Sequence, residues 1–253
     1  DWSSDVCSSD LAIYVASVAC HRALVEKGEL SEGELRGAAG LSLGEFTALH
    51  LAGAYSFEDG LKLVRLRGQA MQDAANDGPS TMVALTGDVS EEKVNEICDE
   101  ARGDGILVPA NFNSPMQVVV SGSIESCERV PAVADEMGLK ATPLTVAGAF
   151  HSPIMQPAAE RLGEALEQVE WSPLKAPVIA NVTGEPHDGD DVASIRQKLV
   201  DQLTSPVRWT QSMQWAVENS PGRFVELAPG KVLSGLMKRI DRKVKVENFA
   251  EPG

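Results

Sequence analysis

The stretch AAGLSLGEFTALHLAGA, residues 38–54, places one serine between two glycines and directly before an apolar, helix-forming run. One interpretation is a capped helix, because serine is a favoured N-cap residue and glycine is common in turns. The other is a nucleophile elbow, a sharp strand-to-helix turn in which Ser42 takes a strained backbone and the Leu43 backbone N–H points to a developing oxyanion. A Gly-x-Ser-x-Gly pattern has about a one in ten chance of arising at random here, so the stretch alone leaves both interpretations open.

The chain around this stretch alternates helices with short strands. Apolar residues recur at helical spacing over residues 12–27, and the pattern stops at a glycine. We expect further helices at about 45–51, 56–75, 157–169, 191–203, 209–219 and 231–240, and strands at 176–184 and 223–229. This succession is typical of an α/β domain.

A different pattern begins at residue 80. Its order is strand, helix, strand, strand, helix, strand, which is typical of a ferredoxin-like (βαββαβ) subdomain. Pro131 lies inside the second of these helices, so we expect a kink or a late start there. The simplest architecture is an α/β domain of residues 12–79 and 148–253, interrupted by a small subdomain of residues 80–147.

The composition argues against several classes of function. The chain has 253 residues, 43% of them hydrophobic, and a formal net charge of −15, which disfavours binding to nucleic acid or to anionic membranes. No apolar run is long enough to span a bilayer, and no signal peptide pattern is present. The four cysteines are scattered and show no metal-ligand spacing. We expect reduced thiols, no metal, no cofactor, and a cytoplasmic monomer.

The first eleven residues, DWSSDVCSSDL, differ from the rest of the chain. They repeat Ser-Ser-Asp, show no amphipathic period, and back-translate to a sequencing-library adapter read in frame. We therefore expect residues 1–11 to be a non-native leader, with the natural sequence resuming near Leu11.

Residues 231–245 are a local exception to the acidic balance. They carry six basic residues against one aspartate: Lys231, Lys238, Arg239, Arg242, Lys243 and Lys245. One interpretation is a solvated helix end at which cations are favourable, and the other is a docking patch for an acidic partner.

A serine hydroxyl becomes a good nucleophile when a base takes its proton, so Ser42 needs a nearby histidine. His50 lies about 12 Å further along the following helix and is expected to be structural. His21 lies in the middle of a helix, and His187 lies in GEPHDGDD, which we expect to be a flexible polar loop. His151 remains the best candidate, because it lies where the inserted subdomain ends; a capping or core histidine is the alternative.

Arg67 lies on the inward face of the helix expected over residues 56–75. Phe57, Val64 and Met71 define that face, whereas Arg65 projects away from it. A buried guanidinium must find an anion, which is either a structural carboxylate of this chain or the carboxylate of a substrate. The pattern favours neither.

Six segments occur in the order and spacing of the bacterial malonyl-CoA:acyl carrier protein transacylases, and the chain resembles this family from about residue 12 onward. The segments are GLSLGEFTALHLAGA, VRLRGQAMQ, NFNSPMQVVVSG, GAFHSPIM, DQLTSPVRW and ELAPGKVLSGLMKRI. The resemblance implies an α/β-hydrolase-like domain with a parallel sheet and an inserted ferredoxin-like subdomain. It also implies acyltransferase activity in fatty acid biosynthesis, with malonyl-CoA and acyl carrier protein as partners.

The resemblance further implies roles for individual residues. Ser42 resembles the acyl-accepting nucleophile, and His151 resembles its base. The main-chain carbonyl of Gln202 resembles the group that orients the histidine, and Arg67 resembles the arginine that holds the malonyl carboxylate.

Two more residues resemble parts of the family's site: Phe150 the malonyl-selecting residue, and Asn113 a residue that lines the site. The basic segment then reads as a docking site for the acidic carrier or for CoA phosphates, with Lys238, Arg239 and Arg242 as its contacts. The implied reaction is ping-pong, through a malonyl-serine ester.

The chain departs from the family pattern in two places. Leu41 stands where the family usually has histidine, which we expect to tune the site without abolishing activity. Family members also begin with a strand and a Gly-Gln-Gly-Ser-Gln loop that helps to form the oxyanion hole. The leader stands in their place here, so we expect transfer by this chain to be severely impaired.

Three other interpretations remain at this stage. The chain could be a serine esterase of the same fold, an acyltransferase domain of a polyketide synthase, or an inactive fragment that binds carrier protein without turnover. In a hydrolase the triad order is Ser, acid, His, and the acids between Ser42 and His151 fall mostly on expected surface helices.

Overall fold

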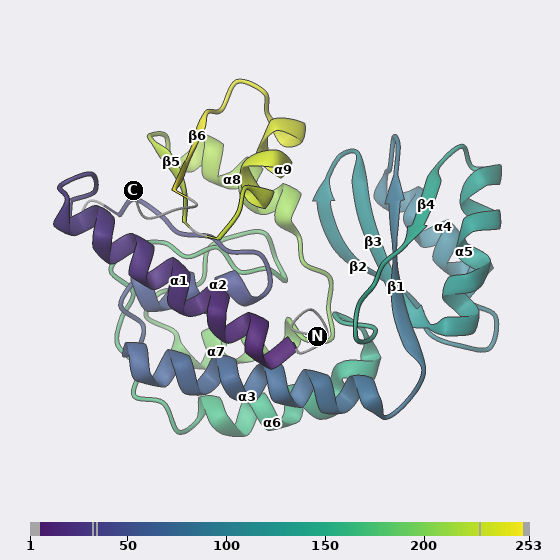
Figure 1. Cartoon of the computed structure of the whole chain (residues 1–253), viewed down its shortest axis with the longest axis horizontal. Helices are drawn as coiled ribbons and strands as arrows, with labels where there is room; N and C mark the ends of the chain where they lie inside the picture. The colour runs from purple at the N-terminus through teal and green to yellow at the C-terminus, as the bar shows by residue number, and fades with distance from the viewer. Residues whose placement is uncertain (1–5, 32, 34, 228, 250–253) are drawn as a thin grey trace.

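The structure, a computed structural model, describes residues 6–31, 33, 35–227 and 229–249. It is a mixed α/β fold of two unequal parts that lie side by side (Figure 1). The larger part consists of α1 (Val6–Glu26), α2 (Leu43–Leu51), α3 (Phe57–Asn76), η1 (Pro153–Met155), α6 (Gln156–Leu166), α7 (Val192–Asp201), α8 (Trp209–Asn219), β5 (Phe224–Leu227), α9 (Val232–Ile240) and β6 (Val246–Phe249). The smaller part consists of β1 (Ser80–Thr86), α4 (Glu91–Arg102), β2 (Leu107–Ser114), β3 (Gln117–Ser123), α5 (Ile124–Glu136) and β4 (Lys140–Pro143).

The smaller part has the predicted succession of strands and helices. Its four strands form an antiparallel sheet in the order β2-β3-β1-β4. Side chains alternate between the two faces of a strand. Val83 and Leu85 of β1 therefore pack with α4 and α5, whereas Met82 and Ala84 pack on the opposite face, which Phe150 also contacts. The sheet thus separates two apolar layers.

The core of the larger part is helical. Buried side chains from α1, α2, α3, α6 and α7 form one cluster, to which Tyr14, Phe46, Leu63, Leu162 and Leu199 contribute. A second cluster joins α8 and α9. The only named strands of this part in the described residues, β5 and β6, pair in parallel. β6 was not expected from the sequence.

The strand expected at 176–184 is wrong. Only an isolated parallel bridge between Ala38 and Val178 and an antiparallel one between Ile179 and Pro186 form there. The pairing stops because the chain turns next: the Gly184 N–H donates to the Ala180 carbonyl oxygen (2.9 Å), and Gly184 has a φ of +73°.

Two further expectations about helices need correction. The first helix begins at Val6 instead of residue 12, because its first turns pack closely on α3; a Cβ on Gly68 would lie 2.6 Å from the Cys7 Cα. The helix around Pro131 begins at Ile124, so the expected late start is wrong, and Pro131 lies in its interior. Residues 1–5 of the expected leader lie outside the described residues.

No helix within the described ranges is long and apolar enough to cross a membrane. No disulfide joins the four cysteines, all of which the structure describes.

Candidate active site

Ser42 lies in a strained turn directly before α2. Its backbone has φ 52° and ψ −103°, and its side chain makes no capping hydrogen bond to the helix. Ser42 and His151 are the only non-glycine residues with positive φ in the part of the chain that the structure describes. Strain of this kind persists where the surrounding structure enforces it, often at functional sites. The geometry therefore favours the elbow interpretation over simple capping.

The two glycines beside Ser42 have different reasons to be there. A Cβ on Gly40 would overlap the backbone of Gly44, so the turn closes only with glycine at position 40. A Cβ on Gly44 would meet no atom within 4 Å. Close packing of the turn thus requires glycine at position 40 and leaves room for a side chain at position 44.

A hydrogen-bonded chain joins Ser42, His151 and Gln202. His151 Nε2 lies 2.9 Å from Ser42 Oγ, and His151 Nδ1 lies 2.7 Å from the main-chain oxygen of Gln202. A carbonyl oxygen only accepts, so we assign the proton to Nδ1, which leaves Nε2 free to accept the serine proton. The structure thus brings together the three groups that the sequence analysis singled out.

The His151 ring is 4% exposed. Burial lowers the pKa of His151 to about 4 from 6.5, and the positive charge of Arg67 adds to this, although the hydrogen bond to Gln202 opposes it. The imidazole is therefore neutral at neutral pH, as a general base must be.

Arg67 is buried and reaches the serine, whereas Arg65 is exposed. The Arg67 Nη2 donates to Ser42 Oγ (2.6 Å), and Nη1 donates to Asp10 Oδ2 (2.8 Å). Its Nε has no hydrogen-bond partner in the described structure. In this chain a structural carboxylate, Asp10, is thus the anion beside the guanidinium.

Burial dominates the electrostatics of the Arg67–Asp10 pair. An ion pair alone would lower the carboxyl pKa and raise the guanidinium pKa. Instead, burial raises the pKa of Asp10 and lowers the pKa of Arg67, against the attraction between them. A buried pair of this kind is a weak source of stability.

In the described structure, the side chains of the other expected site residues make no hydrogen bond to Ser42, His151 or Arg67. Phe150, next to His151, packs against two apolar clusters. The Asn113 Oδ1 is buried and has no partner among the described residues. Leu41 packs against the cluster of α8 and α9. Leu43 is the first residue of α2, so its N–H has no acceptor within the helix.

The sequence analysis missed a buried polar network beneath the serine. Glu45 is fully buried, and Asn181, His187 and the Gln202 side chain all hydrogen-bond to its carboxylate. The expectation of a flexible loop around His187 is wrong, because this histidine is buried and held by Glu45. The sequence signal that could have indicated this network is Glu45, a carboxylate three residues after the serine.

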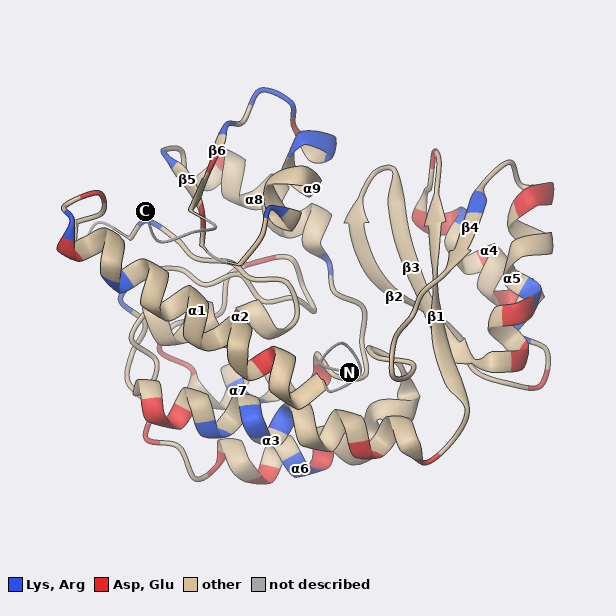
Figure 2. Ribbon diagram, viewed as in Figure 1, with Lys and Arg blue, Asp and Glu red and all other residues tan. Residues whose placement is uncertain are grey.

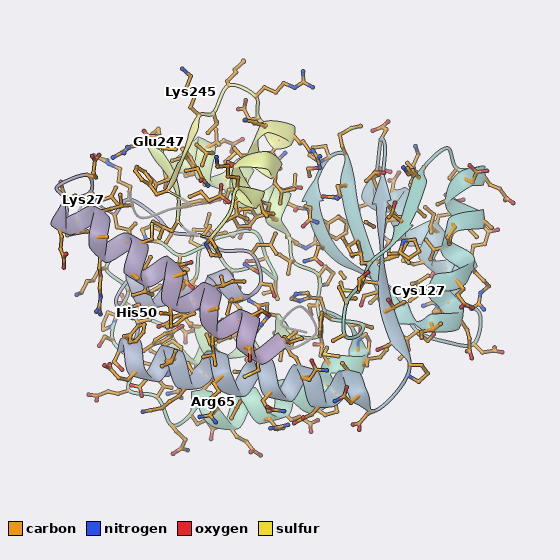
Figure 3. The ribbon with its side chains drawn as sticks, viewed as in Figure 1. Lys27, His50, Arg65, Cys127, Lys245 and Glu247 are labelled. Atoms are coloured by element: carbon orange, nitrogen blue, oxygen red, sulfur yellow. The ribbon has the colours of Figure 1, made fainter. Side chains whose placement is uncertain are left out.

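The expected docking residues are exposed on one side of the larger part. Lys238 and Arg239 lie in the last turn of α9, and Arg242 follows it. Figure 2 shows these cations on α9 and on the adjoining loop to β6, and Figure 3 shows Lys245 projecting outward from the same region. No group of three or more potential metal ligands occurs among the described residues.

Sequence and structure comparisons point to one family. Residues 5–250 match the family model of the acyl transferase domain. The chain is 41% identical over 216 residues to the malonyl CoA-acyl carrier protein transacylase of Bacillus subtilis, an alignment that covers 85% of this chain and 67% of that protein.

Solved structures agree. The malonyl-CoA:acyl carrier protein transacylase of Xanthomonas oryzae superposes with a TM-score of 0.91 and 42% identity, over 98% of this chain and 77% of that one. A malonyl-transacylase in complex with a type II PKS acyl-carrier protein superposes with a TM-score of 0.90 and 36% identity, over 98% and 79% of the two chains. The chain therefore belongs to the acyl transferase domain family.

Proposed function

We propose that this chain transfers the malonyl group of malonyl-CoA to the phosphopantetheine thiol of an acyl carrier protein, as a step of fatty acid biosynthesis. The observation that carries the proposal is the hydrogen-bonded chain Ser42–His151–Gln202 with the Arg67 guanidinium against the serine oxygen. The malonyl transacylases among its relatives support the choice of substrate and partner.

In the proposed acylation, Ser42 Oγ attacks the thioester carbonyl carbon while His151 Nε2 takes the serine proton. The Leu43 N–H, at the positive end of α2, stabilises the oxyanion. The intermediate then expels the CoA thiolate, which takes the proton from His151. The carrier thiol attacks the malonyl-serine ester by the same steps in reverse order.

Arg67 is the proposed ligand of the malonyl carboxylate. A guanidinium grips a carboxylate through two parallel hydrogen bonds, and an acyl group without charge leaves it unpaired. Here Asp10 already takes one of its nitrogens. The substrate carboxylate must therefore displace Asp10, or bind through the unpaired Nε together with an Nη2 that leaves Ser42 Oγ and Gln202 Oε1.

The esterase alternative fits the geometry less well. Hydrolases of this kind orient the histidine with a carboxylate, but the partner of His151 Nδ1 is the Gln202 carbonyl. A buried arginine on the serine oxygen also has no role in hydrolysis of a neutral ester. Assays of simple ester hydrolysis and of transfer to a carrier protein distinguish the two.

We also propose that the smaller part is a ferredoxin-like subdomain and that the larger part is an α/β-hydrolase-like domain. The sheet order β2-β3-β1-β4 supports a ferredoxin-like subdomain, and the turn at Ser42 supports an α/β-hydrolase-like main domain.

Charge reversal at the basic patch tests the carrier partner. The assay measures transfer from malonyl-CoA to phosphopantetheinylated carrier protein. We expect the KM for carrier protein to rise severalfold in the triple variant Lys238→Glu, Arg239→Glu, Arg242→Glu, because charges at an interface steer the encounter of the two proteins. A control variant makes the same change in net charge at exposed cations just after α1 and on α3: Lys27→Glu, Lys62→Glu, Arg65→Glu. An unchanged KM in the first variant would remove this patch from the docking site.

A further inference from the structure

A buried carboxylate beneath the serine takes no part in the mechanism above. Glu45 lies in the first turn of α2 and is 0% exposed. Its Oε2 accepts hydrogen bonds from the Asn181 N–H (3.1 Å) and from Gln202 Nε2 (2.6 Å). Its Oε1 accepts one from His187 Nε2 (2.7 Å). Three donors on one buried carboxylate are more than a helix cap requires.

The first of these partners holds both sides of the strained turn. The Ser42 N–H donates to Asn181 Oδ1 (2.6 Å), and Asn181 Nδ2 donates to the Gly40 carbonyl oxygen (2.8 Å). The bond from the Asn181 N–H to Glu45 fixes the backbone from which that side chain extends. The position of Ser42 therefore depends on Glu45 through Asn181.

The second partner places the base. Gln202 Nε2 donates to Glu45 and to the Ser42 carbonyl oxygen (3.1 Å), while the Gln202 main-chain oxygen accepts from His151. Gln202 caps the end of α7, so its side-chain bonds fix the residue that carries this carbonyl. The orientation of the His151 ring depends on Glu45 through Gln202.

His187 fixes the carboxylate itself. Its backbone N–H donates to the Val178 carbonyl oxygen (2.8 Å), which anchors this part of the chain, and its ring holds Oε1 of Glu45. Both carboxylate oxygens are thus held, Oε1 by His187 and Oε2 by Asn181 and Gln202.

We propose that Glu45 is a positioning residue for acylation: by holding Asn181 and Gln202, it fixes the strained Ser42 and the ring of His151. This inference rests on the proposed role of Ser42 as the nucleophile. In the described structure the Glu45 carboxylate has no hydrogen bond to Ser42 Oγ or to His151, so it acts through the two intermediate residues. Displacing reacting groups by about 1 Å can cost about a hundredfold in rate.

The test separates the effect of the length of the Glu45 side chain from the effect of its charge. Glu45→Asp keeps the charge but shortens the side chain by one methylene, whereas Glu45→Gln keeps the length and loses the charge. The readout is the rate at which a fluorophosphonate probe labels Ser42, together with kcat and KM for malonylation. We expect Glu45→Asp to label about tenfold more slowly or worse, with kcat reduced and KM unchanged, and Glu45→Gln to stay closer to the parent.

A matched control is Glu226, the other buried glutamate among the residues that the structure describes; it is 4% exposed and accepts hydrogen bonds from Leu233, Ser234 and Asn248. Glu226→Asp makes the same chemical change outside the network and should label at the parental rate. Folded Glu45→Asp that labels at the parental rate would overturn the proposal.

Two safeguards keep the test decisive. Where Glu45→Asp does not fold, Gln202→Met replaces it, because this change keeps the main-chain carbonyl and removes the side-chain bonds to Glu45 and to the Ser42 carbonyl oxygen. Slow labelling supports the proposal, and parental labelling overturns it. Probe labelling of the parent without malonylation would contradict the proposed function and leave the positioning role of Glu45 standing.

Discussion

Replacing His151 with glutamine should slow malonylation of Ser42 by about 10²- to 10⁴-fold, the usual contribution of a positioned general base. Glutamine can still hydrogen-bond to the serine, but it cannot take the proton. Because the ring contacts both Ser42 and Gln202, the loss should appear in kcat more than in KM. Single-turnover kinetics with malonyl-CoA, followed by mass spectrometry, measures it.

The pH dependence of the malonylation rate is a second test of the role of His151. Burial lowers the pKa of His151 to about 4. The malonylation rate should therefore stay level as the pH falls from about 8 to about 5, where an ordinary histidine would already be protonated. A rate that falls with an apparent pKa near 6.5 would contradict the assignment of a buried, neutral base.

The same shift affects stability. The unfolded histidine titrates near 6.5 and the folded one near 4, so the unfolded chain binds more protons between these values. The contribution of His151 to folding is thus complete above pH 6.5 and is lost as the pH falls toward 4. Between pH 6.5 and 4, the free energy of unfolding should fall less in His151→Gln than in the parent, because the variant has no imidazole to protonate. Urea unfolding of both proteins measures the difference.

The second large effect is expected at Arg67. Arg67→Met should slow malonylation about a hundredfold or more while leaving acetylation from acetyl-CoA nearly unchanged, because only the malonyl group carries a carboxylate for the guanidinium. Competition between the two acyl-CoA substrates measures the selectivity. An unchanged malonyl preference would remove Arg67 from substrate recognition.

Asp10→Asn should have the opposite effect to Arg67→Met on the use of malonyl-CoA. It removes the charge that now neutralises Arg67 and so should lower the KM for malonyl-CoA severalfold. The double variant Arg67→Met, Asp10→Asn avoids a buried unpaired carboxylate and should be as unselective as Arg67→Met. A malonyl-CoA KM that Asp10→Asn leaves unchanged or raises would contradict competition between the two carboxylates.

The helices and the antiparallel sheet were predictable because their patterns are local. The apolar face that put Arg67 inward in α3 is a helical period, and Ser56 and Ser90 cap their helices as their positions indicate. The alternating apolar residues of β1 and β3 likewise define strands with two packed faces. Local patterns of this kind carry most of the fold.

The parts that failed depend on contacts between distant segments. His187 was expected in a flexible loop because its neighbours are polar, yet it is buried by Glu45, 142 residues away in sequence. The strand expected over residues 176–184 is replaced by isolated bridges, because Asn181 turns its side chain to Gly40 and the chain reverses at Gly184. The sequence also did not predict Asp10 as the partner of Arg67, because Asp10 lies in a segment without amphipathic pattern. Such pairings are decided in three dimensions.

The central claim is that Ser42 carries the malonyl group. Incubating the chain with malonyl-CoA and measuring its intact mass, followed by peptide mapping, reads this directly and needs only one turnover per molecule. The account predicts one malonyl group per chain, located on Ser42, and none on Ser42→Ala. A parent chain that stays unmodified, or a Ser42→Ala chain that is malonylated to the same extent, would contradict it.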